Sequence, residues 1–295
     1  MIREAGEADF AAATELMNAL SPFRVGSSAG LLHTARTEPA AAARRFWAAE
    51  DDGALVGWGT AVIDYETADA AGFANIAVAS SHSKRGIGSS LLAACLAHLE
   101  DLRVDVVRGR SEPDAHTRAF AAGQGFEQTS VTRVSGVDPA AVTAAEPPPD
   151  VELVALETLP VEVVFALDDE VSQDVPNEQL DAVELQQWVE DHWRHPDRDL
   201  TGSTAALVDG QLASYSFLRV APDGRAITDM TGTRREHRGR GLAEIVKRAT
   251  LVNAARRGAS IAITYNDATN AAMLRVNERL GYRPLGETLG WARRR

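Results

Sequence analysis

Short apolar runs alternate along this chain with stretches in which apolar residues recur every three or four positions. The short runs predict strands, and the three-to-four spacing predicts helices with one buried face. The first half is predicted to contain, in order, a strand over Ile2 to Ala5, helices over Ala8 to Leu20 and Pro39 to Glu50, and a hairpin around Asp52-Gly53. The second half is predicted to contain a strand over Val151 to Leu156, helices over Leu159 to Val171 and Glu178 to His192, and a hairpin around Asp209-Gly210.

A longer internal repeat follows each hairpin. The apolar run Ala74 to Val78 leads into the turn 82–88 (HSKRGIG), a helical stretch, a strand near Val104 to Val107, another helix and Gly125-Phe126. The run Ile227 to Thr233 leads into the turn 237–243 (HRGRGLA) and the same sequence of elements, with a strand over Ala259 to Tyr265 and a helix from about Ala268, ending at Gly281-Tyr282. Such a repeat predicts two copies of one α+β domain.

The boundary between the copies is predicted from composition. Residues 135–150 combine small and acidic residues with Pro147-Pro148-Pro149, which suits an extended linker. We therefore place the first domain at residues 1–134, the linker at 135–150 and the second domain at 151–295.

Charge and composition narrow the function. The 295 residues include 30 Lys plus Arg and 42 Asp plus Glu, a net charge of −12 that argues against a dedicated nucleic-acid binder. No apolar run is long enough to span a membrane and no signal peptide is evident, so we expect a cytoplasmic protein. The single cysteine, Cys95, excludes an internal disulfide, and His192 and His195 lack an evident third ligand, so no metal site is expected.

The second glycine-rich turn predicts an anion site. A strand that runs through Arg238-Gly239-Arg240-Gly241 into a helix brings backbone amides together at the positive end of the helix dipole. Residues 234–257 contain eight basic and two acidic residues, which favours a polyanionic ligand. A Walker A loop is excluded because no Gly-Lys pair exists, and a dinucleotide fingerprint is excluded because the third glycine is missing. For one such turn alone, a tight turn without a ligand would be the better interpretation.

Arg238-x-x-Gly241-x-Ala243 resembles the signature of the GNAT acetyltransferases, and the order of elements in both halves is similar to their fold. The resemblance implies a tandem GNAT protein, an α+β fold in which each domain has a mixed central sheet flanked by helices. It implies acetyl-CoA as the acyl donor and a small-molecule amine as the acceptor, with the protein acting as a monomer or homodimer. It also implies which residues contact acetyl-CoA: Arg238, Gly239, Arg240, Gly241, Leu242 and Ala243 at the pyrophosphate, Met230, Thr231, Gly232 and Thr233 along the pantetheine arm, and Asn270 and Asn277 from the last helix.

The first copy departs from the signature. Ser83 stands at the position of Arg238, Lys84 at that of Gly239, and Asp114 at that of Asn270. We therefore expect a structural or substrate-shaping role for the first domain and catalysis in the second.

The catalytic groups are harder to assign. Asp229, on the strand before the turn, is the leading candidate for the general base, and its spacing from Thr231 and Thr233 predicts that all three side chains share a face. The alternative is that Asp229 only pairs with an arginine. The family's usual tyrosine acid is replaced by Asn277 and, in the first copy, by Ala121.

Three further interpretations stay open. The acidic residues near the end of the helix Leu159 to Val171 are either an entrance for a cationic amine or a solvated surface; they are Asp168, Asp169, Glu170 and Asp174. The protein could be a non-catalytic acyl-CoA-binding or regulatory protein. It could also be a biosynthetic acetyltransferase that resembles mycothiol synthases.

Overall fold

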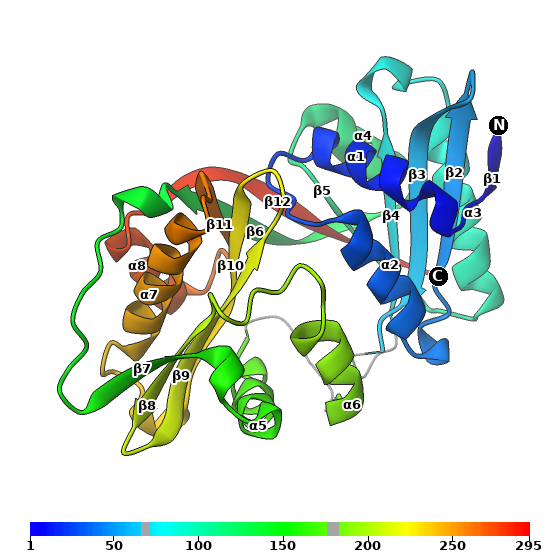
Figure 1. Ribbon diagram of the computed structural model, residues 1–295. Helices are drawn as coiled ribbons and strands as arrows, with labels where there is room; N and C mark the ends of the chain where they lie inside the picture. Colours follow the sequence, from blue (N-terminus) through cyan, green and yellow to red (C-terminus); the bar gives the residue numbers. More distant parts are fainter. Residues whose placement is uncertain (66–70, 176–182) are drawn as a thin grey trace. The chain divides into compact units, whose positions relative to one another are not determined.

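The computed structural model describes residues 1–65, 71–175 and 183–295 (Figure 1). The chain forms two compact units: unit 1 contains residues 1–132 and 287–295, and unit 2 contains residues 133–286. This division differs from the predicted boundaries in two places. Residues 135–150 belong to unit 2, and the last nine residues return to unit 1.

Unit 1 is a mixed sheet covered by helices on both faces. Its strands lie in the order β1-β2-β3-β4-β5-β12; β1 to β4 are antiparallel neighbours, β4 and β5 are parallel, and β5 and β12 are antiparallel. The elements are β1 (Ile2–Glu4), α1 (Phe10–Leu20), α2 (Ser28–Thr37), β2 (Arg45–Asp51), β3 (Ala54–Ile63), β4 (Gly72–Val78), α3 (Ile87–Asp101), β5 (Val106–Ser111), α4 (Ala115–Gly123) and most of β12 (Arg283–Arg294). The chain then passes along β6 (Glu127–Val137) from unit 1 into unit 2.

Unit 2 repeats this plan. Its strands lie in the order β6-β11-β10-β9-β8-β7, with β10 and β11 parallel and β7 to β10 antiparallel. Its elements are β7 (Val151–Ala155), α5 (Val161–Ser172), α6 (Leu185–Trp188), β8 (Thr204–Val208), β9 (Gln211–Val220), β10 (Arg225–Thr233), α7 (Leu242–Arg256), β11 (Ile261–Asp267) and α8 (Ala271–Arg279). The predicted α+β fold with mixed sheets is confirmed.

One predicted helix is wrong. The second half of the stretch Pro39 to Glu50 is strand, because β2 occupies residues 45–51 and pairs along its length with β3. Phe46 and Ala48 are buried from β2, an alternation that suits a strand with one covered face. Of the predicted helix Glu178 to His192, residues 178–182 lie outside the described residues; α6 and a π-helix over Val189–Trp193 form most of the remainder.

Each unit buries one long helix against the middle of its sheet. In unit 1, α3 places Leu92, Cys95 and Leu99 in a core that also includes Trp291 from β12. Burial raises the pKa of the Cys95 thiol to about 12, in keeping with a packing role. In unit 2, α7 and α8 cover one face of the sheet and α5 the other (Figure 1).

In both units the two parallel strands part where they approach the glycine-rich turn. Strands β4 and β5 pair only at Gly72 and Phe73 of β4, and β10 and β11 only over residues 225–227 of β10. Among the described residues, no strand pairs with the rest of β10, up to Thr233, on its β11 side. A ligand with an extended polar chain could therefore pair with this edge.

Candidate functional site

The two glycine-rich turns have the same backbone conformation. In unit 2, Gly239 and Gly241 have φ angles of +78° and +77°. In unit 1, the aligned Lys84 and Gly86 have φ angles of +61° and +81°. Helix α7 or α3 begins at the next residue in each case, so both turns form the same concave arrangement of amides at a helix N-terminus.

The turns differ in the space in front of those amides. A Cβ added at Gly239 or Gly241 would meet no atom within 4 Å, so the approach to this turn is open. The same is true of Gly86, but Lys84 carries a side chain where unit 2 has Gly239. The turn of unit 2 is therefore the better fit for a bulky anion.

Acidic side chains neutralise the arginines around the turn of unit 2. Arg238 donates from Nε to the Thr233 carbonyl (3.1 Å) and from Nη2 to Asp174 (2.5 Å). Arg235 contacts the same carboxylate at 3.0 Å. Hydrogen bonds from Arg235 and Arg238 lower the pKa of Asp174 to about 2. A phosphate ligand would replace Asp174 as the partner of these arginines.

The predicted acidic entrance is not one surface. Asp168 is buried and accepts hydrogen bonds from Trp188 Nε1 (2.7 Å) and the Tyr215 hydroxyl. Glu170 and Asp174 instead face the arginines that flank the turn. Neither location suits the steering of a cationic amine.

A bulge in β10 reverses the predicted side of Asp229. The register of β10 against β9 shifts between Thr228 and Thr231, so two residues oppose one. Thr231 and Thr233 lie on the face that α7 covers, where they contact Ser216 and Ser214 at 2.9 Å. Asp229 lies on the opposite face, with two arginines. The predicted shared face is therefore wrong.

Asp229 forms an ion pair with both arginines. Its Oδ2 lies 3.1 Å from Arg198 Nη1 and 2.8 Å from Arg219 Nε. Burial alone would raise the pKa of Asp229, but the charges of Arg219 and Arg198 outweigh it and hold the pKa well below its usual range. Such a carboxylate is a weak base, and the geometry favours the alternative interpretation of Asp229.

The two asparagines of the last helix have different environments. Asn270 caps α8 by accepting from the Met273 amide (3.2 Å), as Asp114 caps α4 in unit 1. Asn277 is buried and donates to Asn266 Oδ1 at 2.6 Å. Its own Oδ1 has no hydrogen-bond partner among the residues that the structure describes.

A buried polar cluster beneath β10 and β11 was missed from the sequence. Lys247 Nζ donates to Thr264 Oγ1 (3.1 Å) and lies 5.1 Å from the centre of the Tyr282 ring. Tyr282 in turn bonds Thr228 through their hydroxyls (2.6 Å). Burial lowers the pKa of Lys247 to about 7. The internal repeat could have predicted that Lys247 is buried. Lys247 follows Gly241 by the same number of residues as the core residue Leu92 follows Gly86.

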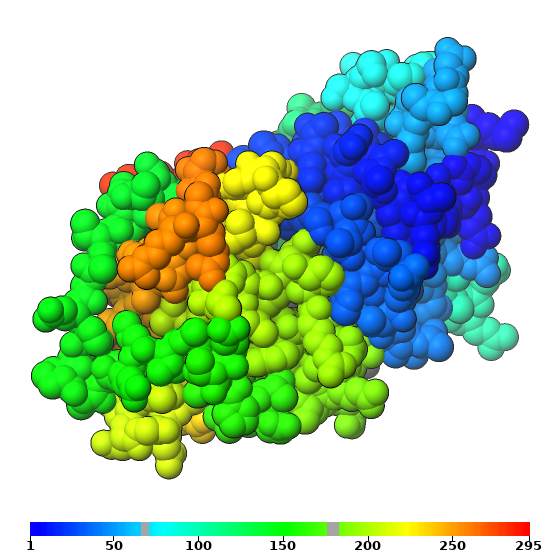
Figure 2. Space-filling view, viewed as in Figure 1, coloured from blue at the N-terminus to red at the C-terminus, as the bar shows by residue number. Residues whose placement is uncertain are grey.

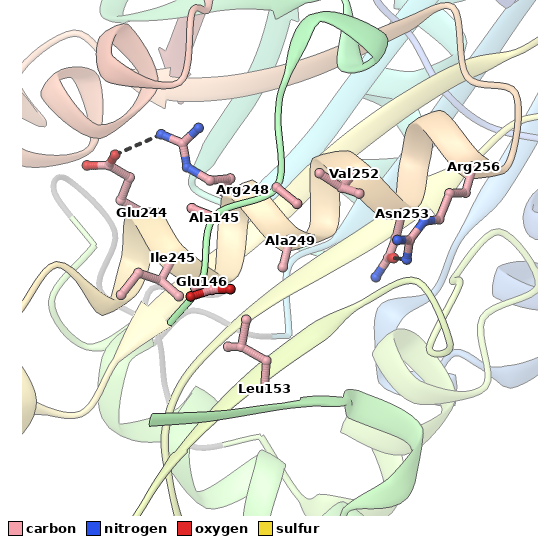
Figure 3. Close-up of a pocket in the computed structure, with 11 residues that line it drawn as sticks. Ala145, Glu146, Leu153, Glu244, Ile245, Arg248, Ala249, Val252, Asn253 and Arg256 are labelled. Atoms are coloured by element: carbon pink, nitrogen blue, oxygen red, sulfur yellow. Dashed lines mark hydrogen bonds and ion pairs between the residues drawn. The ribbon is translucent and has the colours of Figure 1, made fainter. Parts of the chain in front are cut away.

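A cavity of about 340 Å³ lies on the outer side of α7, against the segment that leads to β7 (Figure 3). In the space-filling view, green atoms of this part of the chain lie beside the orange atoms of α7 (Figure 2). Glu244 accepts from Arg248 (3.0 Å) inside it and also pairs with Arg279 (2.6 Å). Its lining residues include none from the turn 235–241. This cavity is therefore separate from the anion site.

The described residues contain neither a cluster of metal ligands nor a membrane-spanning helix. No group of three or more His, Cys, Asp or Glu residues there could hold a metal ion. No helix in that part of the chain is both long and apolar enough to cross a membrane.

Residues 13–126 match the acetyltransferase (GNAT) family. This segment is similar to the GNAT domain over 114 residues, less than half of the chain. GNAT proteins use acetyl-CoA as their acyl donor. The match lies in unit 1, although the sequence predicts the intact cofactor turn in unit 2. No curated protein matches the chain.

Solved structures extend the similarity to both units. A tandem GNAT protein from the clavulanic acid biosynthesis pathway is 21% identical, with a TM-score of 0.77 over 100% of this chain and 98% of its own. A GCN5-related N-acetyltransferase from Sphaerobacter thermophilus is 15% identical, with a TM-score of 0.74 over 100% of this chain and 95% of its own. The chain thus has the tandem GNAT fold.

Proposed function

We propose that this protein is an N-acetyltransferase that transfers the acetyl group of acetyl-CoA to the amine of a small molecule, and that unit 2 binds acetyl-CoA. One observation carries the proposal: an open glycine turn and an unpaired strand edge occur together at the same end of β10. A pyrophosphate needs the first and an extended amide-bearing arm needs the second.

Different residues of unit 2 would bind different parts of acetyl-CoA. The amides around Gly239 and Gly241 would bind the pyrophosphate, together with the side chains of Arg238 and Arg240. The free edge of β10 over residues 230–233 would pair with the pantetheine arm. Asn270, which starts α8 beside β11, stays the candidate for a further contact.

Acetyl-CoA supplies an activated thioester. The acceptor nitrogen forms a bond to the carbonyl carbon, the carbon–sulfur bond breaks, the nitrogen loses a proton and the sulfur gains one. Asp229 is too weak a base to take that proton readily, and Asn277 has no proton to give at neutral pH. The acceptor must therefore arrive as the neutral amine, with water completing the proton transfer.

A second candidate function is acyl-CoA binding without transfer. The arginine-paired Asp229 and the amide pair of Asn277 favour it, because both positions lack an active acid or base. Acetyl-CoA turnover over a panel of amines, followed by release of free thiol, separates the two candidates. Thiol release that depends on an amine supports transfer, and its absence in a protein that binds CoA supports the second candidate.

The location of the site is tested by a matched pair of variants. Gly241→Glu and Gly86→Glu introduce the same charge at the same turn position, with similar backbone strain because both φ angles are near +80°. We expect calorimetry to find one CoA site per chain. The affinity for CoA should fall by about 100-fold or more in Gly241→Glu, because two charge-assisted hydrogen bonds are lost. It should stay unchanged in Gly86→Glu. The opposite result would move the site to unit 1.

A further inference from the structure

A cluster of charged residues lies on the face of the unit 2 sheet opposite α7. It consists of Arg198, Arg219 and Asp229, and it adjoins the bulge that precedes residues 230–233 of β10. Arg198 and Arg219 are bridged through their backbones, which places the two guanidinium groups next to each other. Two positive charges thus share one carboxylate.

Arg198 is held inside the protein by several contacts. Its side chain is 1% exposed, and it donates to Asp229 (3.1 Å) and to the His192 carbonyl (3.0 Å). Its guanidinium also lies 4.2 Å from the centre of the Phe217 ring. Arg198 is therefore a buried charge that presents almost no surface to a ligand.

Arg219 is different. Its Nε lies 2.8 Å from Asp229 but makes no hydrogen bond of good geometry. Its two terminal nitrogens contact no acceptor in the part of the chain that the structure describes, and the side chain is 27% exposed. The planar pair of Nη groups is therefore available, and this is the geometry that binds a carboxylate in bidentate fashion.

Two neighbouring groups, His192 and Asp168, leave the terminal nitrogens of Arg219 without a hydrogen bond, although the charge of Asp168 acts on Arg198. Burial and the adjacent charge of Arg198 lower the pKa of His192 to about 3, so it is neutral and contributes no charge. Asp168 is engaged by Trp188 and Tyr215 and makes no hydrogen bond to either arginine. An anion beside the terminal nitrogens of Arg219 would therefore form a charge-assisted pair that no neighbouring group already makes.

We infer that the acceptor carries a carboxylate, as an amino acid does, and that Arg219 binds it. The inference rests on the proposed function, since it identifies the substrate class of the same site. Asp229 is then a positioning residue, because it orients Arg219 from the side opposite the ligand. The carboxylate would be held next to the bulge, where the acyl arm on residues 230–233 ends.

The test compares N-acetylamino acids with their carboxamides, which differ only in the charge of the terminal group. These are products of the proposed reaction, so binding by calorimetry requires no turnover. We expect at least one N-acetylamino acid of a side-chain panel to bind 10- to 100-fold more tightly than its carboxamide, the effect of about one charge-assisted hydrogen bond. Arg219→Gln should abolish that preference.

Arg225→Gln is the matched control, because it removes a guanidinium that pairs with Asp223 near the start of β10. It should leave the preference intact. Equal binding of acids and carboxamides across the panel, or a preference that survives in folded Arg219→Gln, would overturn the inference even in an active enzyme. A preference that needs Arg219 in a protein without turnover would keep the inference and count against the proposed function.

Discussion

Asp229 is the residue whose role depends most on its neighbours. Its position on β10, just before the glycine-rich turn, predicts a general base. In the fold it pairs with two arginines from other parts of unit 2. Because they stabilise the charged carboxylate, its contribution to folding is present above about pH 4 and is lost as pH falls through its lowered pKa. At neutral pH its effect is therefore structural.

Asp229→Asn tests this role. The amide keeps the shape but leaves Arg198 buried without its counter-charge, and we expect a loss of about 2 kcal/mol, reduced from the range for fully buried pairs because Asp229 is 33% exposed. Thermal unfolding at pH 7 measures it, with the exposed Asp223→Asn as a nearly neutral control. A folded variant with normal CoA affinity and a rate lower by 10² to 10⁴ would instead establish Asp229 as the base.

Lys247 gives unit 2 a pH-dependent stability. Its pKa falls from 10.5 in the unfolded chain to about 7 in the fold, so between these values the unfolded chain binds more protons and stability rises with pH. Tyr282 stays neutral in this range because burial raises its pKa. Below about pH 7 the fold bears the full free-energy cost of burying the charged Lys247, on the order of a few kcal/mol.

Lys247→Met should remove that cost. We expect the melting temperature to rise by several degrees at pH 6, and the gain to shrink towards pH 10. The control is Leu92→Met at the equivalent position of unit 1, where the core is apolar and no dependence on pH is expected. An equal gain at both pH values would show that packing, and not the charge of Lys247, limits stability.

At the scale of elements, the last strand has the largest consequence. Residues 289–294 of β12 pair with β5, and Leu289 and Trp291 are buried in the core of unit 1. Trp291 Nε1 also donates to Ser111 Oγ at 2.8 Å. Unit 1 is therefore completed by a segment more than 150 residues later in the chain.

A chain that ends at Gly286 should lose much of the stability of unit 1. Removing two large buried side chains costs several kcal/mol, about 3 to 5 for each residue of this kind. Limited proteolysis should then cut within residues 1–132 faster than within residues 133–286. Removal of Arg295 alone, which is exposed, should change nothing. Equal resistance of unit 1 in both truncations would show that β12 is dispensable.

At the scale of the whole molecule, the two units share a backbone plan but differ in chemistry. The parting strands and the left-handed turn residues occur in both. The bulge in β10 and the buried lysine cluster occur in unit 2, whereas β4 pairs with β3 without a register shift and Leu92 packs in an apolar core. This divergence is consistent with a binding role confined to one unit, which the CoA stoichiometry tests.

Features that depend on neighbouring residues could be predicted from the sequence. The repeat of strand, turn and helix was predicted because glycine placement and apolar spacing act over a few residues, and the hairpins at Asp52-Gly53 and Asp209-Gly210 were predicted for the same reason. Features that need partners from distant parts of the chain could not be predicted and are set by the fold. Pairing with β3 makes residues 45–51 a strand, one bulged residue turns Asp229 away from Thr231, and two distant arginines set its charge. Residue spacing in the sequence does not show where a bulge inserts an extra residue into a strand, or which distant residue becomes a partner. Both are set when the chain folds.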